Sequence, residues 1–409
     1  MATKASETAK PATLALVLLL GLAILLNYID RGAIAIASPV LKPELGLTNT
    51  QYGYAVSAFF WTYVPIQLFI GWACDRWCVY RLIAAGIALW ALSTLAMGLV
   101  GGLLSLVIFR VLLGVGESIT FPGASKVIAR HVAPERRGLA NSVVAAGIAL
   151  GPVVGTFAGG LLVASYGWRT MFVVFGLITL VWVAPWLLTA RRLPTFAPAG
   201  REQPVPIGRI ARTGAVWAMG IGHFGATYPL YFIIVWLPLY LTKSRGFSIT
   251  DMTYLATLGF LAQALSAVVQ GWLSDHLVRG GRDSSRIRRA LMVAGNVVMA
   301  GSIVALMKAE TATEIGLWLM LFGAAAATGG VNLYAIAQMF AGPKASGSFI
   351  GIQNGVGNIP GIVMPIITGL IIDWTGVYDN AFWLTAAVCA VSALWWLFGV
   401  PKIRPIALD

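Results

Sequence analysis

Segments apolar enough and long enough to cross a lipid bilayer recur along the whole chain, and they limit its possible folds more than any other feature. A helix needs about 20 apolar residues to span the hydrocarbon core of a membrane. Within a bilayer, only helices and closed barrels satisfy every backbone hydrogen-bonding group. The sequence therefore predicts an all-α integral membrane protein, and its twelve expected transmembrane helices cover residues 12–37, 52–73, 82–100, 102–125, 138–163, 170–190, 214–241, 252–273, 290–307, 315–340, 347–372 and 380–400.

The composition agrees with a membrane protein and excludes other classes. Of the 409 residues, 58% are hydrophobic and 11% are charged, whereas soluble domains carry about 25% charged residues and disordered chains are poor in apolar residues. A net charge of +13 would indicate a nucleic-acid partner in a soluble protein. Here the cytoplasmic loops explain it, because such loops collect Lys and Arg. We therefore expect contacts with membrane lipids and no nucleic acid.

The distribution of Lys and Arg between alternate loops predicts the orientation of the chain. With both termini inside, the inner segments hold 21 basic residues, the outer loops five and the spans two, which accounts for the 28 in the sequence. Such an excess marks cytoplasmic loops, so we expect a multi-pass protein of the bacterial inner membrane with both termini in the cytoplasm. A signal peptide over the first apolar segment is the alternative, although Asp30 and Arg31 interrupt that segment before its candidate cleavage site, residues 35–37.

A polar break near the middle of the chain divides the predicted helices into two sets of six. Residues 191–213 contain five Arg and four Pro, which is typical of a linker. Two motifs of the first half, at residues 71–75 and 160–167, recur 200 and 209 residues later, as expected for a duplicated unit. We therefore predict an N-terminal six-helix bundle over 1–190, a cytoplasmic linker over 191–213 and a C-terminal six-helix bundle over 214–409.

Several motifs resemble a known family of transporters. Residues 71–81 resemble the loop signature G-x-x-x-D-R-x-G-R-R of the major facilitator superfamily, with Cys78 where the family has Gly and Tyr80 where it often has a basic residue. Three further motifs resemble its anion:cation symporter family, which includes bacterial sugar-acid transporters, sialin and vesicular glutamate transporters. These motifs are Asn-Tyr-Ile-Asp-Arg at 27–31, Gly-x-Gly-Glu followed by Phe-Pro at 114–122, and Pro-Glu-Arg-Arg-Gly at 134–138. The resemblance implies the major facilitator fold, with two pseudo-symmetric six-helix bundles.

Four charged residues lie within the predicted membrane spans: Asp30, Arg31, Arg110 and Glu117. Each would cost roughly 2.5–3.5 kcal/mol at the centre of a membrane helix, so we expect them to face a water-filled cavity or one another. Arg31 shares a helical face with Asn27, whereas Asp30 points about 100° away from it. Arg110 and Glu117 are seven residues apart, hence two turns along one face of their helix. Arg110 is either the charge partner of an acid or a substrate contact.

These charges predict a proton-coupled anion site. A planar guanidinium binds a carboxylate through two hydrogen bonds, so we assign Arg31 to the substrate anion. We expect Glu117 to compete with the anion for Arg31 and to release it on protonation, while Asp30 is a second proton carrier. The resemblance implies the same roles for these three residues, and it adds substrate contacts from Tyr28 and Tyr63. A static charge cluster that joins two helices is the alternative.

The other candidate residues are neutral groups of the second half and charged groups at the inner ends of helices. The spans of the second half carry no charge, and analogy with the family makes Asn354 or Asn358 the expected substrate contact there. At the inner ends of the second and third helices, we expect a cytoplasmic gate that opens when the two halves rock, with a positively charged membrane anchor as the alternative. The gate consists of Asp75, Arg76 and Arg81.

We therefore predict a proton-coupled symporter that imports a small organic anion, a monocarboxylate or a sugar acid, by alternating access. We expect a monomer with no cofactor and no metal site, because Cys74, Cys78 and Cys389 lack further ligands at metal-binding spacing. An exporter, or a facilitator that is not coupled to protons, is the alternative within transport. An enzyme is not expected, because the sequence has no H-E-x-x-H motif, no G-x-G-x-x-G motif and no pair of His ligands.

Overall fold

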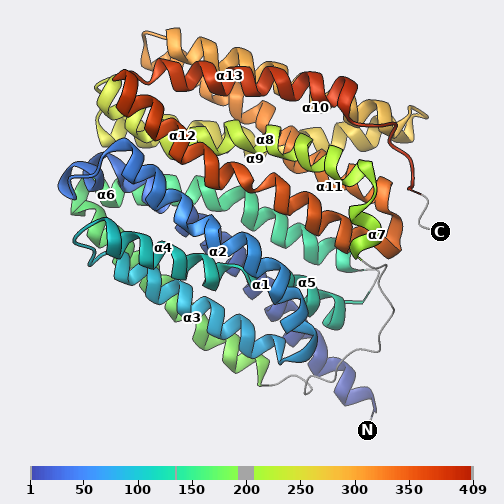
Figure 1. Cartoon of the computed structure of the whole chain (residues 1–409). Helices are drawn as coiled ribbons and strands as arrows, with labels where there is room; N and C mark the ends of the chain where they lie inside the picture. The colour runs from blue at the N-terminus through green and yellow to red at the C-terminus, as the bar shows by residue number, and fades with distance from the viewer. Residues whose placement is uncertain (1, 134–135, 192–206, 407–409) are drawn as a thin grey trace. The chain divides into compact units, whose positions relative to one another are not determined.

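The computed structural model describes residues 2–133, 136–191 and 207–406, without the side chains of residues 2–12, 68, 71, 72, 75, 343 and 344. Throughout these residues the chain forms helices and no strands (Figure 1), so the predicted all-α class is confirmed. The chain divides into two compact units. Unit 1 consists of Met1–Leu47 and Tyr54–Gly200, and unit 2 of Thr48–Gly53 and Arg201–Asp409. The predicted bundle limits stay a prediction, and most of the expected linker lies outside the described residues.

The helices of unit 1 are α1 (Ala2–Glu44), α2 (Asn49–Arg76), of which the first residues group with unit 2, α3 (Val79–Met97), α4 (Leu103–Glu117), α5 (Thr120–His131) and α6 (Arg137–Ala190). Unit 2 contains α7 (Ile207–Ala211), α8 (Gly214–Leu239), the π-helical turn η2 (Tyr240–Ser244), α9 (Ile249–Arg279), α10 (Ser284–Lys308), α11 (Ala312–Gly357), α12 (Ile359–Thr375), α13 (Asp379–Leu394) and the π-helical turn η3 (Trp395–Gly399).

The twelve predicted spans coincide with helices in the described part of the chain. Ten helical segments there are long and apolar enough to cross a membrane. One of these segments, α6, has 54 residues and covers two of the predicted spans, and α2 covers the predicted span that is not among the ten. Inside α6 and α11, Gly167 and Gly342 have φ angles of 82° and 63°. Glycine adopts such angles without steric cost, so these two residues make sharp turns where the sequence predicts loops. The first span also extends beyond its predicted end at residue 37, because α1 continues to Glu44.

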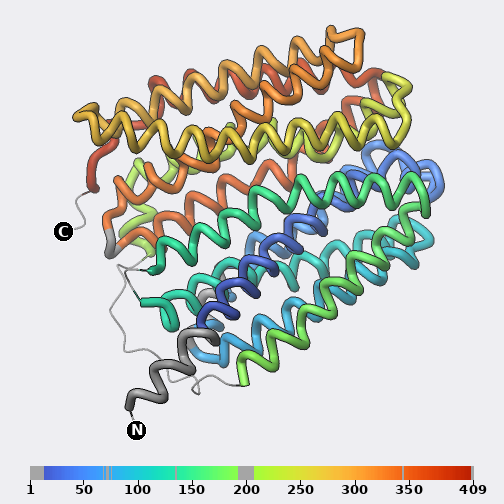
Figure 2. The backbone as a smooth tube through the Cα atoms, turned by 180° about the vertical axis from the view of Figure 1, so that it is seen from behind, coloured from blue at the N-terminus to red at the C-terminus, as the bar shows by residue number. Residues whose placement is uncertain are grey.

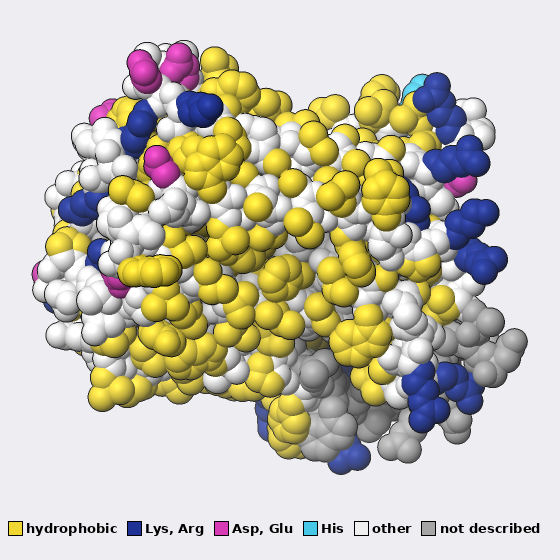
Figure 3. Space-filling view, turned by 45° about the horizontal axis from the view of Figure 1, so that its top comes forward, with side chains coloured by type: hydrophobic (Ala, Val, Ile, Leu, Met, Phe, Trp, Pro, Cys, Tyr) yellow, Lys and Arg dark blue, Asp and Glu magenta, His cyan; other side chains and the backbone are white. Residues whose placement is uncertain are grey.

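The outer surface of the helices is largely apolar. Hydrophobic side chains cover most of the face in Figure 3, and Lys and Arg lie toward its two opposite ends. Val181, Val268 and Phe398 are 70%, 74% and 78% exposed. An apolar surface of this extent marks contact with a membrane or another protein, and it agrees with helices that lie in lipid.

Glycines of α6 let it approach α1 closely, and this contact positions the polar segment of α1. Two opposite views show α1 beside the first part of α6 (Figure 2). A Cβ atom on Gly151 would lie 2.5 Å from Cβ of Tyr28, and one on Gly155 would lie 2.8 Å from Cα of Ile29. Small residues commonly line helix contacts in membranes, because close packing drives association there. The neighbouring Asn27 and Asp30 side chains are buried within unit 1 as a result.

The start of α2 is fixed to α12 within unit 2. The Asp373 carboxylate accepts hydrogen bonds from the backbone N–H groups of Asn49 at 3.0 Å and Thr50 at 2.8 Å. It also accepts from the side chains of the same two residues, at 2.7 and 2.6 Å. The first N–H groups of a helix lack helical partners, and the helix dipole favours a negative charge beside them. Asp373 therefore caps α2 from a different helix.

Candidate functional site

Arg31 is the centre of the candidate site, which lies within unit 1. Its side chain is 14% exposed, and its Nη2 atom donates to Oε2 of Glu117 at 3.1 Å and to Oδ1 of Asn27 at 3.2 Å. The Nε atom of Arg31 donates to the same Oε2 atom at 3.3 Å. Two N–H groups thus meet one carboxylate oxygen, and the opposite charges strengthen both hydrogen bonds. The fold therefore brings together two residues that are 86 positions apart in the sequence.

Three aromatic rings surround the guanidinium of Arg31. Its Cζ atom lies 4.7 Å from the ring centroid of Tyr63, 5.1 Å from that of Tyr28 and 5.2 Å from that of Phe59. The faces of aromatic rings attract a guanidinium electrostatically. Phe59 was not predicted, although it lies one helical turn before Tyr63 on α2 and stacks on it at 5.0 Å. The guanidinium of Arg31 is therefore held by aromatic rings as well as by the Glu117 carboxylate.

Glu117 is the last residue of α4 and is fully buried. Its Oε1 atom and the Nδ2 atom of Asn27 have no hydrogen-bond partner among the described residues. The hydroxyl of Thr120, at the start of α5, donates to the Glu117 carbonyl at 2.8 Å and stabilises the break between the two helices. A buried polar atom without a partner is costly. Oε1 of Glu117 is therefore suited to bind a proton or a hydrogen-bond donor.

Asp30 has different neighbours from Arg31, although the two are adjacent in sequence. Its Oδ2 atom accepts hydrogen bonds from the indole N–H of Trp90 on α3 and, at 3.3 Å, from the hydroxyl of Thr179 on α6. The residue is 1% exposed. The two side chains diverge because successive residues of a helix are rotated by about 100°. The sequence predicted this divergence but gave no sign of Trp90 or Thr179, because uncharged residues are common in membrane spans.

Arg110 is almost fully buried and is bonded to the backbone of α2. Its Nη2 atom donates to the carbonyl of Val56 at 3.0 Å, and its Nε atom donates to that of Ala55 at 3.4 Å. Its guanidinium also lies 5.1 Å from the ring centroid of Phe59. The ring of Phe59 therefore neighbours both Arg110 and Arg31. The role of Arg110 as a charge partner stays a prediction.

The candidate residues of unit 2 belong to a polar cluster on α8 and α11 and at Asn358, which lies between α11 and α12. The hydroxyl of Tyr231 donates to Oδ1 of Asn358 at 2.8 Å, and the amide of Asn358 donates to the carbonyl of Asn354 at 2.8 Å. The hydroxyl of Tyr334 donates to Oδ1 of Asn354 at 3.3 Å. Gln353 is fully buried, and neither of its amide atoms has a hydrogen-bond partner within the described residues. The cluster thus presents neutral donors and acceptors.

The predicted cytoplasmic gate is described only in part. Arg76 is the last residue of α2 and Arg81 lies in the first turn of α3, and both are exposed. The side chain of Asp75 lies outside the described residues, so the gate stays a prediction.

Unit 2 has a charged cluster at the position of the repeated motif. Arg288 donates to Oδ1 of Asn332 at 3.2 Å, and its Nη2 atom lies 3.8 Å from Oδ1 of Asp275. Asp275 is the repeat of Asp75 in the sequence. The internal repeat could therefore have predicted a role for Asp275 and a basic partner.

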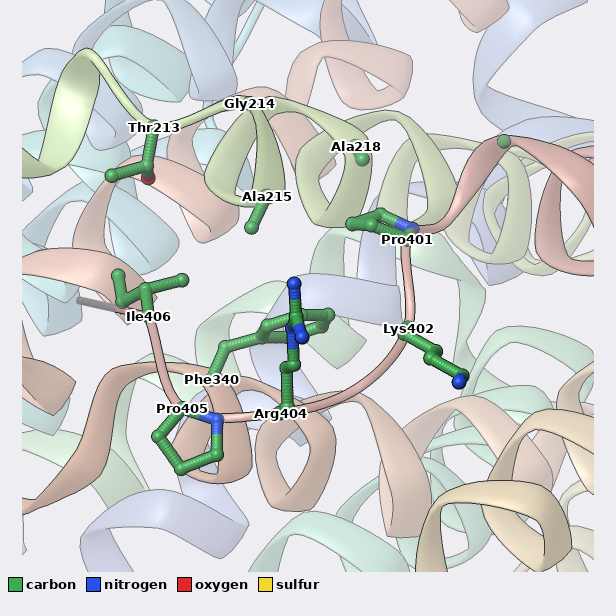
Figure 4. Close-up of a pocket in the computed structure, with 11 residues that line it drawn as sticks. Thr213, Gly214, Ala215, Ala218, Phe340, Pro401, Lys402, Arg404, Pro405 and Ile406 are labelled. Carbon is green, nitrogen blue, oxygen red and sulfur yellow. The ribbon is translucent and has the colours of Figure 1, made fainter.

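A pocket in unit 2 lies outside the candidate site. The start of α8, Phe340 and residues 399–406 line it, with Lys402 and Arg404 as its charged groups (Figure 4). The Ile406 N–H donates to the Phe340 carbonyl at 2.8 Å and holds this segment in place. None of the predicted site residues lines the pocket. Within the described part of the chain, no group of three or more His, Cys, Asp or Glu residues could hold a metal ion.

Twelve apolar helices and a buried site of opposite charges define the class of this protein as a polytopic membrane transporter. The model of the Major Facilitator Superfamily matches residues 20–282 and 280–407. The chain therefore belongs to the major facilitator superfamily, whose members are transporters and not enzymes. It is similar to the crystal structure of a bacterial homolog of the human lysosomal transporter Spinster, in an inward-facing and unoccupied conformation. The TM-score is 0.82 at 17% identity, over 96% of this chain and 98% of that chain, and this likeness confirms the predicted fold.

Relatives of similar length are named as transporters of organic anions. A probable galactarate/D-glucarate transporter of Bacillus subtilis is 29% identical, over 96% of this chain and 93% of the relative. A hexuronate transporter of the same organism is 27% identical, over 93% of both chains. A probable sulfoacetate transporter of Cupriavidus necator is 27% identical, over 92% of this chain and 91% of the relative. The family resemblance seen in the sequence motifs is thereby confirmed.

Proposed function

We propose that this protein is a proton-coupled symporter that imports a small organic anion across the bacterial inner membrane by alternating access. The relatives support an anionic substrate, since galactarate, glucarate, hexuronates and sulfoacetate all carry carboxylates at neutral pH. The excess of Lys and Arg in alternate loops supports cytoplasmic termini. In this proposal the protein acts as a monomer.

The observation that carries this proposal is the buried pair of Arg31 and Glu117. The Glu117 carboxylate has the charge and the geometry of a substrate carboxylate, so it holds the guanidinium in the arrangement that an anion would need. A substrate that replaces Glu117 gains the same hydrogen bonds and contacts the rings of Tyr28 and Tyr63. The exchange is unfavourable while Glu117 stays charged, because an unpaired carboxylate in a buried site costs several kcal/mol.

Proton binding removes this cost and thereby couples the two ions. A proton from the outer side binds the Glu117 carboxylate, which loses its charge-assisted hydrogen bonds to Arg31, and the substrate carboxylate takes its place. After the site opens to the cytoplasm, Glu117 releases its proton, returns to Arg31 and displaces the anion. Asp30 is a second proton carrier, and its protonation leaves the positive charge of Arg31 in excess. Coupling follows because the proton shifts the equilibrium toward the state that binds the anion.

Asn354 and Asn358 contact the uncharged part of the substrate in this proposal. The hydroxyls of Tyr334 and Tyr231 orient their two amides, and Gln353 offers further donor and acceptor atoms. Polar groups of this kind bind hydroxyls and reject an analogue that lacks them, since they would then be left unpaired. The cluster therefore favours a hydroxylated sugar acid over a plain short carboxylate.

Uptake into proteoliposomes tests the proposal. The purified protein is reconstituted, the outer pH is set below the inner pH, and the uptake of labelled D-glucarate, galactarate, a hexuronate and sulfoacetate is followed. We expect at least one of them to accumulate above its outer concentration, and a protonophore to abolish the accumulation. Uptake that ignores the pH gradient would instead indicate a facilitator, and accumulation driven only by the reversed gradient would indicate an exporter.

The variant Glu117→Gln separates coupling from binding, because glutamine imitates the neutral carboxyl. We expect exchange of the anion between the two sides to be retained and accumulation driven by the pH gradient to be lost. The matched control is Glu44→Gln, since Glu44 is an exposed carboxylate of unit 1 that pairs with Arg169. Accumulation that survives in Glu117→Gln would show that another group couples the proton.

A further inference from the structure

The carboxyl of Asp30 is held by one of its two oxygens only. Oδ2 accepts hydrogen bonds from Trp90 on α3 and Thr179 on α6, so three helices meet at this atom. Oδ1 is buried and has no hydrogen-bond partner among the residues that the structure describes. Both oxygens of an ionised carboxylate accept hydrogen bonds, whereas a protonated carboxyl has one oxygen that donates. The two oxygens of Asp30 are therefore unequal before any proton binds.

The indole of Trp90 decides which oxygen can carry a proton. Trp90 is fully buried, and an indole N–H can donate a hydrogen bond but never accept one. Oδ2 must therefore keep one lone pair for Trp90 in both protonation states of Asp30, and Thr179 donates to its other lone pair. This leaves Oδ1 as the oxygen that binds the proton.

Thr94 lies beside the Asp30 carboxyl and can interact with it in both protonation states. It lies four residues after Trp90 and hence on the same face of α3. Its hydroxyl is buried beside the Asp30 carboxyl and also has no hydrogen-bond partner within the described residues. A hydroxyl can donate to an ionised oxygen or, after a rotation, accept from a protonated one. Trp90 and Thr94 thus place an obligatory donor and an adaptable hydroxyl beside one carboxyl.

The backbone of Trp90 also touches the helix that carries Glu117. A Cβ atom on Gly116 would lie 2.7 Å from the backbone nitrogen of Trp90 and 2.8 Å from its Cβ atom. Gly116 directly precedes Glu117, and Asp30 directly precedes Arg31. Trp90 therefore links the surroundings of Asp30 to those of the Arg31–Glu117 pair.

We propose that Trp90 is a positioning residue for proton coupling: its indole N–H fixes Oδ2 of Asp30, so that the proton is carried on Oδ1. This role of Trp90 rests on the proposed function in one respect, namely that Asp30 takes part in proton coupling. The ionisable group that acts on Asp30 is Glu117 from α4, whereas α3 and α6 contribute the uncharged Trp90, Thr94 and Thr179. On α1 itself, the charged neighbour of Asp30 in the sequence is Arg31.

Infrared difference spectra of the reconstituted full-length protein, recorded as the pH is changed, test the proposal without a substrate. The variant Asp30→Asn assigns the carboxyl band of Asp30, and Trp90→Phe keeps the aromatic ring but removes the N–H. The hydrogen bond from Trp90 favours the ionised form of Asp30. Its loss in Trp90→Phe should therefore move the pH midpoint of the Asp30 carboxyl band upward by about one pH unit. Thr179→Val removes the other donor to Oδ2 and should move it in the same direction.

The matched control is Trp186→Phe. The indole of Trp186 is also fully buried in unit 1, but it donates to the backbone carbonyl of Tyr80 at 2.9 Å. In Trp186→Phe, we expect the Asp30 carboxyl band to have the same pH midpoint as in the wild type. An unchanged midpoint in Trp90→Phe, an equal shift in Trp186→Phe, or a carboxyl band that survives unaltered in Asp30→Asn would overturn the proposal. Uptake of D-glucarate into the same liposomes tests symport separately: a shifted midpoint without proton-driven uptake would keep the role of Trp90 and reject the symporter.

Discussion

Arg31 combines the contacts that an anion-binding residue of a membrane transporter needs. A carboxylate, an amide and three aromatic rings surround its guanidinium, and the side chain retains 14% exposure. The carboxylate neutralises the charge while no anion is bound, and the rings exclude much of the water that would weaken the interaction with an anion. The same guanidinium can therefore exchange one carboxylate for another without ever being left unpaired.

Arg31→Lys tests the need for a planar, forked cation. Lysine keeps the charge but loses the second N–H contact with a carboxylate and stacks less well on the rings. We expect the affinity for the anion to fall by about tenfold to hundredfold, the equivalent of a hydrogen bond to a charged group. The affinity is measured with the carboxylate that raises the unfolding temperature of the wild type most.

The control for this variant is Arg169→Lys. Arg169 pairs with Glu44 and lies 4.2 Å from the ring of Trp168, but both charged side chains are 44% exposed. Its replacement should leave the affinity unchanged. Wild-type affinity in Arg31→Lys would remove Arg31 from the substrate site.

The sequence revealed the charges of the candidate site, and the family resemblance added Tyr28 and Tyr63, whose rings lie beside Arg31. A charged residue in an apolar segment is conspicuous, and helical geometry separates Asp30 from Arg31, so those residues were found. Phe59, Trp90 and Thr179 were missed, because such side chains occur throughout membrane helices and nothing local distinguishes them. Their roles depend on which helices become neighbours, and the spacing of residues along one helix does not contain that information.

Among the elements, α1 and α6 determine where the site lies. Glycines at positions 147, 151 and 155 of α6 follow a spacing of four residues and contact successive turns of α1. The contact at Gly151 is with Tyr28, whose ring flanks Arg31. The Tyr28 ring can therefore take this position because residue 151 of α6 is glycine and has no side chain.

Gly151→Ala tests this dependence. The added Cβ atom would come within 2.5 Å of Cβ of Tyr28 and 2.9 Å of the Leu25 carbonyl. Overpacking of this kind typically costs about 1–3 kcal/mol, so we expect a lower unfolding temperature in detergent and weaker anion binding. Gly301→Ala in α10 is the control, because its Cβ would meet no atom within 4 Å; it should leave both quantities unchanged or raise the stability slightly. Equal behaviour of the two variants would refute a role for Gly151.

The helices themselves were largely predictable, and their connections were not. Twelve apolar segments give twelve spans because lipid admits few other structures. The sharp turns at Gly167 and Gly342 depend on single backbone angles, and many other glycines of this chain lie inside regular helices. The cap of α2 by Asp373 was also missed, because nothing local in the sequence relates the two elements. Asp373 lies 324 positions after Asn49 and 323 positions after Thr50.

For the whole molecule, orientation in the membrane is the property on which transport direction depends. The excess of Lys and Arg in alternate loops predicts that the turn between α9 and α10 is cytoplasmic and that the turn between α10 and α11 is external. Arg282→Cys and Glu310→Cys place a thiol in each turn, at residues that are exposed. In intact cells, a membrane-impermeant thiol reagent should label Glu310→Cys and should label Arg282→Cys only after lysis. The opposite pattern would invert the proposed topology.

The exchange of partners at Arg31 is the central claim, and isothermal titration calorimetry of anion binding tests it most directly. Binding heats measured in two buffers of different ionisation enthalpy give the number of protons taken up with the anion. We predict an uptake of at least one proton per anion near neutral pH, because Glu117 must be neutralised before Arg31 can change partner. The uptake should fall by about one proton per anion in Glu117→Gln while binding persists. Wild-type binding without proton uptake, or an unchanged uptake in Glu117→Gln, would contradict the account.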